Sequence, residues 1–348
     1  MKLAITADVH LKSYKDTPGR YQAMEDIFKQ AQAEKVSTVL ICGDLFDADF
    51  NNYSDFEKLA GHYPKLDLWI LPGNHDSNLS RKSMAGKNIR IFEKAELVGD
   101  RLKFLMIPYL PGKTMGDVIA EFSADLEANE WVLCGHGDWL EGRRNPNPYE
   151  PGTYMPLTRS DLTQYQPAQV FLGHIHARRN EPIYYPGSPC GLDISETGQR
   201  RFLLFDTDKN QVESRTVENE LTYQACTLTI LPVKDEAAYI GKRTDEIKKR
   251  WMDDQPDLKR NSIRVRVQGV TQDKSSLLKS LKKAFKDYKF YNNEDFDTTG
   301  LNWSGDQERV SIAESVSKKI EDLSLNLSPD EPDRDQVLLE SLALIFKD

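Results

Sequence analysis

Five short polar clusters in the sequence carry the residue types that bind metal ions and transfer protons. In chain order they are Asp8-Val9-His10, Gly43-Asp44, Gly73-Asn74-His75-Asp76, Gly135-His136 and Gly173-His174-Ile175-His176. Five of the six histidines lie inside these clusters, and only His62 lies outside them. Oxygen donors combined with imidazole nitrogens, without thiolates, form a mixed set that suits Mn, Fe or Zn.

These clusters contain more donors than one tetrahedral ion needs. The candidate ligands are Asp8, His10, Asp44, Asn74, His136, His174 and His176. Their number suits two ions that lie about 3.5–4 Å apart and share a bridging carboxylate, which is the arrangement that holds the attacking and leaving oxygens in phosphoryl chemistry. The set predicts a two-metal site, whereas a single histidine would more often be an ordinary core or surface residue.

Each cluster lies at the end of an apolar run that is typical of a β-strand. We predict strands over residues 2–7, 37–42, 67–71, 103–107, 131–134 and 169–172, with helices over 19–34 and 115–129. Strands that alternate with helices predict an α/β fold. Ligands in such folds collect beyond the carboxyl ends of the strands, so we expect the five loops to converge there.

The character of the sequence changes near residue 218. Strands over 201–206 and 211–217 precede that point, and strands over 222–230 and 262–269 with a helix over 275–288 follow it. Two short amphipathic helices are predicted over 310–322 and 335–346. We therefore predict three parts, namely 1–218, 219–303 and 304–348. The terminal helices are too small to bury both faces alone, so they either dock back or bind a partner.

The charge of the chain is unevenly distributed. The 348 residues carry a formal net charge of -9, which argues against a protein that coats nucleic acid with its whole surface. Residues 259–289 nevertheless hold ten Lys or Arg against two Asp. This segment is either a solvated helix face or a contact for phosphate groups. The loop between Asp138 and Pro156, with Arg143 and Arg144, is either a surface loop or a substrate contact.

Other features of the sequence bear on the compartment. No apolar run approaches the roughly 20 residues of a membrane span, so we expect no membrane partner. The four cysteines are scattered without Cys-x-x-Cys spacing, which argues against a disulfide framework or a zinc ribbon. A cytoplasmic location is the expectation that fits these observations.

The ordered series of five clusters resembles the calcineurin-like metallophosphoesterase superfamily over roughly the first 180 residues. The resemblance implies a four-layer α/β/β/α sandwich with a small α+β cap domain and a C-terminal helical pair. It also implies two divalent metal ions, with manganese expected. One ion would take Asp8, His10 and His176, the other would take Asn74, His136 and His174, and Asp44 would bridge them.

The same resemblance implies a catalytic role for His75. In the family, the histidine of Asn-His-Asp is the acid or electrostatic group outside the metal shell, so we expect His75 to steady the transition state and to protonate the leaving oxygen. Asp47 matches the second acid of the family's Gly-Asp-x-x-Asp pattern. We therefore expect Asp47, rather than Asp76, to orient His75.

Further motifs indicate one branch of the superfamily. Protein phosphatases of this class carry Asp-Arg-Gly after the second motif and Glu in place of Asp76, which the sequence lacks. The stretches 43–47 (GDLFD), 185–189 (YPGSP) and 196–198 (ETG) resemble the SbcD-type DNA repair nucleases of cells and large bacteriophages. That branch implies a 3'-5' exonuclease on duplex ends and a single-strand endonuclease, which act in double-strand-break processing and recombination.

The resemblance also implies partners. These are DNA, an SMC-like ABC ATPase of the SbcC type that binds the C-terminal helices, and a second copy of the chain. Candidate DNA contacts are Arg143, Arg144, Lys259, Arg260, Lys279, Lys282, Lys283 and Lys286. Two alternatives stay open, namely a phosphodiesterase for small or cyclic nucleotides and a catalytically silent structural subunit of a DNA repair complex.

Overall fold

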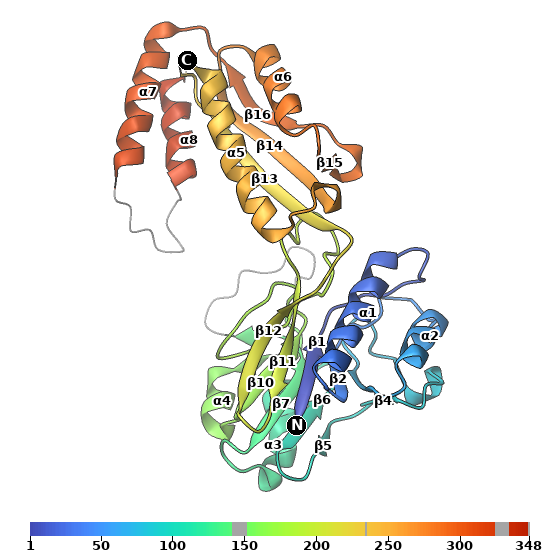
Figure 1. Cartoon of the computed structure of the whole chain (residues 1–348). Helices are drawn as coiled ribbons and strands as arrows, with labels where there is room; N and C mark the ends of the chain where they lie inside the picture. Colours follow the sequence, from blue (N-terminus) through green and yellow to red (C-terminus); the bar gives the residue numbers. More distant parts are fainter. Residues whose placement is uncertain (141–151, 234, 324–333, 347–348) are drawn as a thin grey trace. The chain divides into compact units, whose positions relative to one another are not determined.

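The computed structural model describes residues 1–140, 152–233, 235–323 and 334–346. Figure 1 shows a mixed α/β chain. It divides into two compact units, of which unit 1 comprises residues 1–192 and 199–220, and unit 2 comprises residues 193–198 and 221–348. The predicted change of character near residue 218 lies close to this division. The separate C-terminal part, 304–348, stays a prediction.

Unit 1 alternates strands with helices. Its elements are β1 (Lys2–Thr6), α1 (Pro18–Ala33), β2 (Thr38–Cys42), α2 (Ser54–His62), β3 (Asp67–Leu71), β4 (Ile89–Ile91), β5 (Glu96–Val98), β6 (Lys103–Ile107), α3 (Met115–Phe122), β7 (Trp131–His136), β8 (Trp139–Leu140), β9 (Leu157–Thr158), α4 (Arg159–Tyr165), β10 (Gln169–Gly173), β11 (Arg201–Asp206) and β12 (Gln211–Thr216). Local chemistry sets several boundaries. Pro18 opens α1, where its missing N–H costs nothing, and Thr114 and Asp117 form a capping box on α3.

Two mostly parallel sheets form the framework of unit 1. One has the order β12-β11-β1-β2-β3-β4. In this sheet β1 to β4 are parallel, β11 is antiparallel to β1, and β12 is antiparallel to β11. The other has the order β10-β7-β6-β5, in which β10, β7 and β6 are parallel. Since parallel strands end at the same edge of a sheet, each sheet gathers its predicted clusters at one edge.

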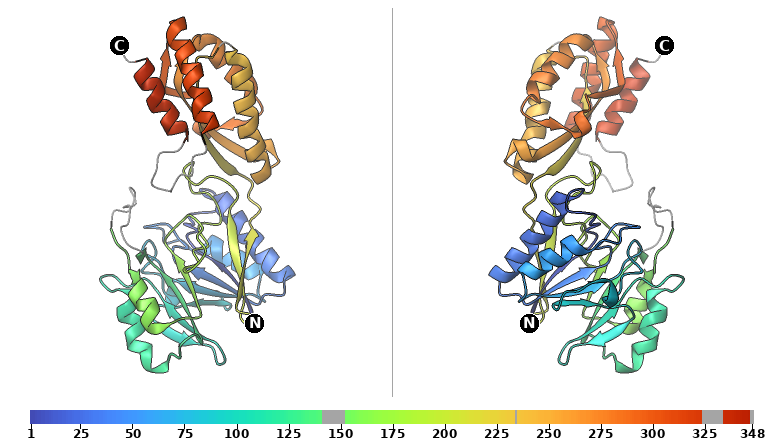
Figure 2. Two further views of the ribbon diagram at one scale, coloured as in Figure 1. Left: turned by 90° about the vertical axis from the view of Figure 1, so that its left-hand side faces the viewer. Right: turned by 90° about the vertical axis from the view of Figure 1, so that its right-hand side faces the viewer.

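Three apolar cores hold these sheets and their helices together. The core between the sheets contains Ile5 of β1 and Phe205 of β11 from one sheet and Phe171 of β10 from the other. The rings of Phe171 and Phe205 lie 5.1 Å apart, and each buried side chain of this size contributes about 1.5–3 kcal/mol. Phe28 of α1 packs in the second core, and Ile119 of α3 packs in the third. Figure 2 shows α1 and α2 together beside the strands of the first sheet.

Unit 2 contains a second α/β arrangement. Its elements are β13 (Thr222–Ile230), α5 (Glu236–Asp254), β14 (Asn261–Thr271), α6 (Lys274–Ala284), β15 (Lys289–Phe290), β16 (Asp297–Trp303), α7 (Gln307–Asp322) and α8 (Arg334–Ile345). The strands β13, β15 and β16 all pair in parallel with β14. Helices α5 and α6 share a core with this sheet through Trp251, Leu281 and Phe285. Among the described residues, no helix is long and apolar enough to cross a bilayer.

The C-terminal helices pack on the rest of unit 2. Ala313 and Ile320 of α7 and Leu338 and Leu342 of α8 form a buried cluster with Leu231, which follows β13. Figure 2 shows the two helices side by side. The sequence left two possibilities for these helices, namely docking on the same chain and binding a partner. Contacts within the chain cover most of their apolar residues.

Several observed elements differ from the predicted ones. The helix predicted over 275–288 ends at Ala284, and α2, α4 and β16 were not predicted. The helix predicted over 115–129 ends at Phe122, because residues Ser123–Asp125 form a tighter 3-10 turn. Helix α5 was not predicted, since only Ile240, Thr244, Ile247 and Trp251 of its 19 residues are buried and charged residues obscure their spacing.

Candidate metal centre

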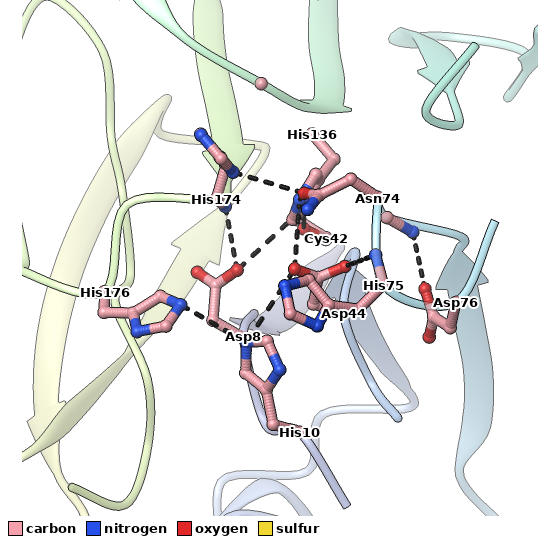
Figure 3. A network of polar contacts seen from close by, with 12 residues as sticks. Asp8, His10, Cys42, Asp44, Asn74, His75, Asp76, His136, His174 and His176 are labelled. Atoms are coloured by element: carbon pink, nitrogen blue, oxygen red, sulfur yellow. Dashed lines mark hydrogen bonds and ion pairs between the residues drawn. The ribbon is translucent and has the colours of Figure 1, made fainter. Parts of the chain in front are cut away.

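The five predicted clusters converge at the carboxyl ends of strands from both sheets of unit 1. Asp8 and His10 follow β1, Asp44 follows β2, and Asn74 follows β3. His136 is the last residue of β7, and His174 and His176 follow β10. Figure 3 shows these side chains pointing toward one another. All seven predicted ligands therefore belong to one cluster, although their positions span residues 8 to 176.

The backbone at this convergence is unusually constrained. Asp8, His10, Asp44 and His174 all have positive φ, between 51° and 97°. Such conformations cost about 1–3 kcal/mol each and concentrate at functional sites. Glycine is required where the sheets approach one another, because a Cβ on Gly173 would overlap the carbonyl oxygen of Cys42. The loops hold their side chains in position at a cost to stability.

One group of potential ligands consists of Asp8, His10 and His176. Their ligand atoms all lie within 4.8 Å of one another. The Nε2 atoms of His10 and His176 are 3.2 Å apart. Within the described part of the chain, the buried Oδ2 of Asp8 has no hydrogen-bond partner. A buried carboxylate so close to two imidazole nitrogens, with one of its oxygens lacking a hydrogen bond, fits a divalent cation that would bind all three side chains.

A second group lies around Asn74. Its Oδ1 is 2.8 Å from Nε2 of His136 and 3.2 Å from Nδ1 of His174. The other ring nitrogen of His136, Nδ1, is 2.9 Å from the carbonyl oxygen of Cys42. A bond to that carbonyl needs a proton on Nδ1. When an ion is bound, the lone pair of Nε2 would therefore be available to it, together with Oδ1 of Asn74.

Asp44 lies between the two groups. Its Oδ2 is 3.7 Å from Nε2 of His10 and 3.4 Å from Nε2 of His136. Its Oδ1 accepts a hydrogen bond of 2.9 Å from the backbone N–H of His75, which fixes the carboxylate. This is the position that a bridging carboxylate needs.

The electrostatics of the cluster favour added positive charge. Burial raises the pKa of Asp8. Burial would also raise the pKa of Asp44, but the histidines around it, His136 first, lower it below its ordinary value. Burial alone would lower the pKa of His136, yet Asp44 and Asp8 raise it to about 9. Without ions, a protonated His136 compensates the buried carboxylates, and bound cations would compensate them instead.

His75 lies at the edge of the cluster. Its Nδ1 is 3.5 Å from Oδ1 of Asp47, and Oδ2 of Asp47 is 3.0 Å from Nζ of Lys12. Asp76 instead accepts backbone N–H groups from Gly73 at 2.6 Å and Phe46 at 3.1 Å. Asp47 therefore faces the His75 ring, and Asp76 fixes the turn. The ring of His75 also lies near His10 and Asp44, with which it forms a third possible ligand group.

The prediction missed one buried carboxylate at this site. Oδ1 of Asp138 lies 3.5 Å from Nε2 of His174, and its Oδ2 accepts a hydrogen bond of 2.7 Å from the backbone N–H of Tyr154. Asp138 is 1% exposed. A carboxylate that contacts the far nitrogen of a metal-binding histidine orients the ring. Its place two residues after His136 was the only available signal.

The predicted DNA contacts belong to two parts of the chain. Arg143 and Arg144 lie outside the described residues. The other six candidates belong to unit 2, and all six are exposed, namely Lys259, Arg260, Lys279, Lys282, Lys283 and Lys286. Lys282 forms an ion pair of 3.3 Å with Asp295, and Arg260 one of 3.6 Å with Asp257. Their use as DNA contacts stays a prediction.

Comparisons with known proteins agree with the motif pattern. The family model for calcineurin-like phosphoesterases matches residues 1–198. No curated protein matches the sequence. Among solved structures, a novel archaeal phosphodiesterase is 18% identical with a TM-score of 0.34, and the match covers 62% of this chain and 100% of that one.

Two further solved structures are similar at comparably low sequence identity. A dimetal phosphatase from Danio rerio is 13% identical with a TM-score of 0.39, and the match covers 64% of this chain and 99% of that one. Nuclease MPE from Pseudomonas putida is 16% identical with a TM-score of 0.28, and the match covers 58% and 84%. These likenesses are too distant to indicate a substrate.

Proposed function

Because the chain belongs to the calcineurin-like phosphoesterase family, we propose that it is a phosphodiesterase that cleaves DNA with two divalent ions, with manganese expected. The observation that carries the proposal is the position of Asp44 between two groups of buried and half-buried donors. Asp8, His10 and His176 would hold one ion, and Asn74, His136 and His174 would hold the other. When bound, the ions supply Lewis-acid charge that offsets the charge developing on the phosphoryl oxygens.

The protein's own contribution to the reaction centres on His75. Since Nδ1 of His75 faces Asp47, Nε2 is the atom that would give a proton to the leaving sugar oxygen. Asp47 would hold the ring in that orientation. Asp138 orients His174 in the same way. The turn that Asp76 fixes keeps Asn74 and His75 on the cluster side.

The larger architecture supports the finer assignment as well. The core between the two sheets, with helices α1 and α3 in the outer cores, favours the α/β/β/α layering of the metallophosphoesterase sandwich. Unit 2 would then supply the DNA-recognition domain. The exposed lysines at α6 support a contact with phosphate groups, which is independent of sequence and weakens with salt. We propose 3'-5' exonuclease activity on duplex ends and endonuclease activity on single strands.

The proposed partner is an SMC-like ABC ATPase that binds the C-terminal helices. Ile312 of α7 and Leu344 of α8 are 46% and 74% exposed, although most of the apolar stripe is covered within unit 2. These residues would contact the partner. Changing both to Ser should abolish co-purification with the co-expressed ATPase and leave hydrolysis of a small diester unchanged.

Incubation with end-labelled linear duplex DNA and Mn²⁺, with and without the ATPase, tests the proposal. We expect loss of the 3'-terminal label, inhibition by chelator, and no activity in the double variant Asp8→Ala with His75→Ala. Hydrolysis of cyclic or dinucleotide substrates without DNA cleavage would support the small-nucleotide alternative. DNA cleavage that persists in the double variant would remove the enzymatic assignment, and DNA binding without any hydrolysis would indicate a silent structural subunit.

A further inference from the structure

Two arginines outside the motifs donate hydrogen bonds to the backbone of predicted ligands in the first group. Nη1 of Arg20 donates to the carbonyl oxygen of His10. Nη2 of Arg200 donates to the carbonyl oxygen of His176 at a distance of 2.6 Å. These are the two histidines whose Nε2 atoms lie 3.2 Å apart. Each arginine therefore fixes the main chain at the residue whose ring would bind the ion.

The loop that carries His176 is held by isolated bridges and hydrogen bonds. No strand is assigned between β10, which ends at Gly173, and β11, which begins at Arg201. Arg200 connects two points of this segment, because its Nε also donates to the carbonyl oxygen of Ser188 at 2.9 Å and its Nη2 to the hydroxyl of Ser188. The backbone N–H of Ser188 donates to the carbonyl of His176 at 3.2 Å. The planar guanidinium group is suited to holding several acceptors at once.

Both arginines are attached to elements that pack on β1. Arg20 lies in the first turn of α1, which shares its core with β1 through Met24 and Ala4. Arg200 directly precedes β11, which pairs with β1 in antiparallel register, Leu203 opposite Ile5. The third ligand of the group, Asp8, follows β1 itself. All three ligands thus take their positions from one strand, although His176 comes from the other sheet.

The second group is positioned by other means. His136 lies within a strand, and its Nδ1 is bonded to Cys42. The N–H of His174 donates to Oδ1 of Asp8 at 2.8 Å. Loss of either arginine should therefore disturb the first group more than the second.

We infer that Arg20 and Arg200 are positioning residues for the metal site formed by Asp8, His10 and His176, and that they set the affinity of this site relative to that of its neighbour. The inference rests on the proposed function for the assignment of the ligands. Outer partners that orient metal ligands typically change affinity by about 10- to 100-fold. We expect effects of this size on one of the two ions.

The test is a titration of the full-length protein with Mn²⁺ that is monitored by calorimetry and by electron paramagnetic resonance. The wild type should bind two ions and give the signal of a spin-coupled pair. Arg20→Gln and Arg200→Gln should bind one ion with nearly unchanged affinity and the second about 10- to 100-fold more weakly, so that an uncoupled signal appears at intermediate concentrations. Arg215→Gln is the matched control, because Arg215 of β12 pairs with Glu34 and Glu213.

Conservative variants separate positioning from general stability. Lysine can replace the contact of Arg20 with His10, so Arg20→Lys should recover most of the affinity. Lysine cannot replace the forked contacts of Arg200, so Arg200→Lys should recover little. An Arg200 variant could fail to fold once a chelator has removed the metal. In that case Ser188→Ala is the substitute, because it removes only one contact of the guanidinium and should weaken the same site less than loss of the arginine.

The outcomes distinguish this inference from the proposed function. A wild type that binds fewer than two ions would overturn the ligand assignment itself. A wild type with two ions and arginine variants with the same two affinities would overturn the positioning role alone. Equal weakening of both sites in all arginine variants would assign these residues to general stability.

Discussion

The loop-end cluster of unit 1 and the lysines at α6 of unit 2 are two polar regions of opposite kind. Asp8, Asp44 and His136 are at most 1% exposed and contact one another, whereas Lys279 and Lys283 are exposed. A buried charge costs several kcal/mol unless a partner compensates it, while an exposed lysine costs almost nothing. The buried cluster therefore needs compensating positive charge for a physical reason, and bound cations would supply it. The exposed lysines need no partner, so their burial and charge alone do not assign them a role.

The change with the largest expected effect removes the shared member of the buried cluster. Asp44→Asn keeps the size of the side chain and an acceptor for the N–H of His75, but it removes the charge between the two groups. Since metal ions supply several kcal/mol of transition-state stabilisation, turnover should fall on the order of a thousandfold or more. Hydrolysis of bis(p-nitrophenyl) phosphate and the metal content of the purified protein measure this.

The matched control is Asp49→Asn, because Asp49 is an exposed aspartate five residues away. It should change neither activity nor metal content. If Asp44→Asn kept both ions and turned over at the wild-type rate, the buried cluster would tolerate the loss of its central charge. The contrast between the buried cluster and the exposed lysines would then not hold.

A smaller effect is expected at the edge of the cluster. His75→Asn should lower the rate of DNA cleavage by about 10²- to 10⁴-fold, which is the usual contribution of a general acid. The loss should be much smaller for a p-nitrophenyl diester, because p-nitrophenolate leaves without protonation. Comparing the two substrates in one preparation, with metal content measured alongside, tests this role.

Two outcomes would change the role that we assign to His75. If His75→Asn lowers metal content, His75 acts as a ligand with His10 and Asp44. Equal losses on both substrates would mean that His75 gives no proton to the leaving group. His62→Asn is the control, since His62 is an exposed histidine at the end of α2.

The smallest effects are expected among the lysines. Combined replacement of Lys279, Lys283 and Lys286 by Gln should weaken duplex DNA binding and leave hydrolysis of the small diester unchanged. The slope of log affinity against log salt should fall by about 0.9 for each DNA phosphate that the variant no longer neutralises. Fluorescence anisotropy at several salt concentrations measures this slope.

A matched triple variant on α5, Lys242→Gln, Lys249→Gln and Arg250→Gln, removes the same amount of exposed positive charge. An equal fall in both variants would mean that total charge, rather than the lysines at α6, governs binding. An unchanged slope in the α6 variant would assign these lysines to the solvated helix face.

The elements of unit 1 that could be predicted are those set by the local sequence. Apolar runs gave strands 67–71, 103–107 and 201–206 with the observed boundaries. The polar residues after those runs predicted which loops would converge, since parallel strands end at a common edge. Five ordered clusters sufficed for the family, because each cluster combines a turn residue with a donor.

Features that depend on contacts between distant segments could not be predicted. Asp138 is one aspartate among many until the fold brings it to His174. The roles of Arg20 and Arg200 depend on backbone carbonyls, which no side-chain pattern reports. Helix α5 presents mostly charged residues, so its core face is too narrow to stand out.

The position of β1 within its sheet has a consequence for how the chain acquires its metal. One edge of β1 pairs with β2, but the other pairs with β11, whose residues 201–206 are synthesised almost 200 residues later. Such long-range pairing makes folding slow. Because the donors come from residues 8 to 176 and Arg200 lies beside β11, the ions would bind only after unit 1 has closed. Metal uptake would then report the last step of folding and would not guide the first.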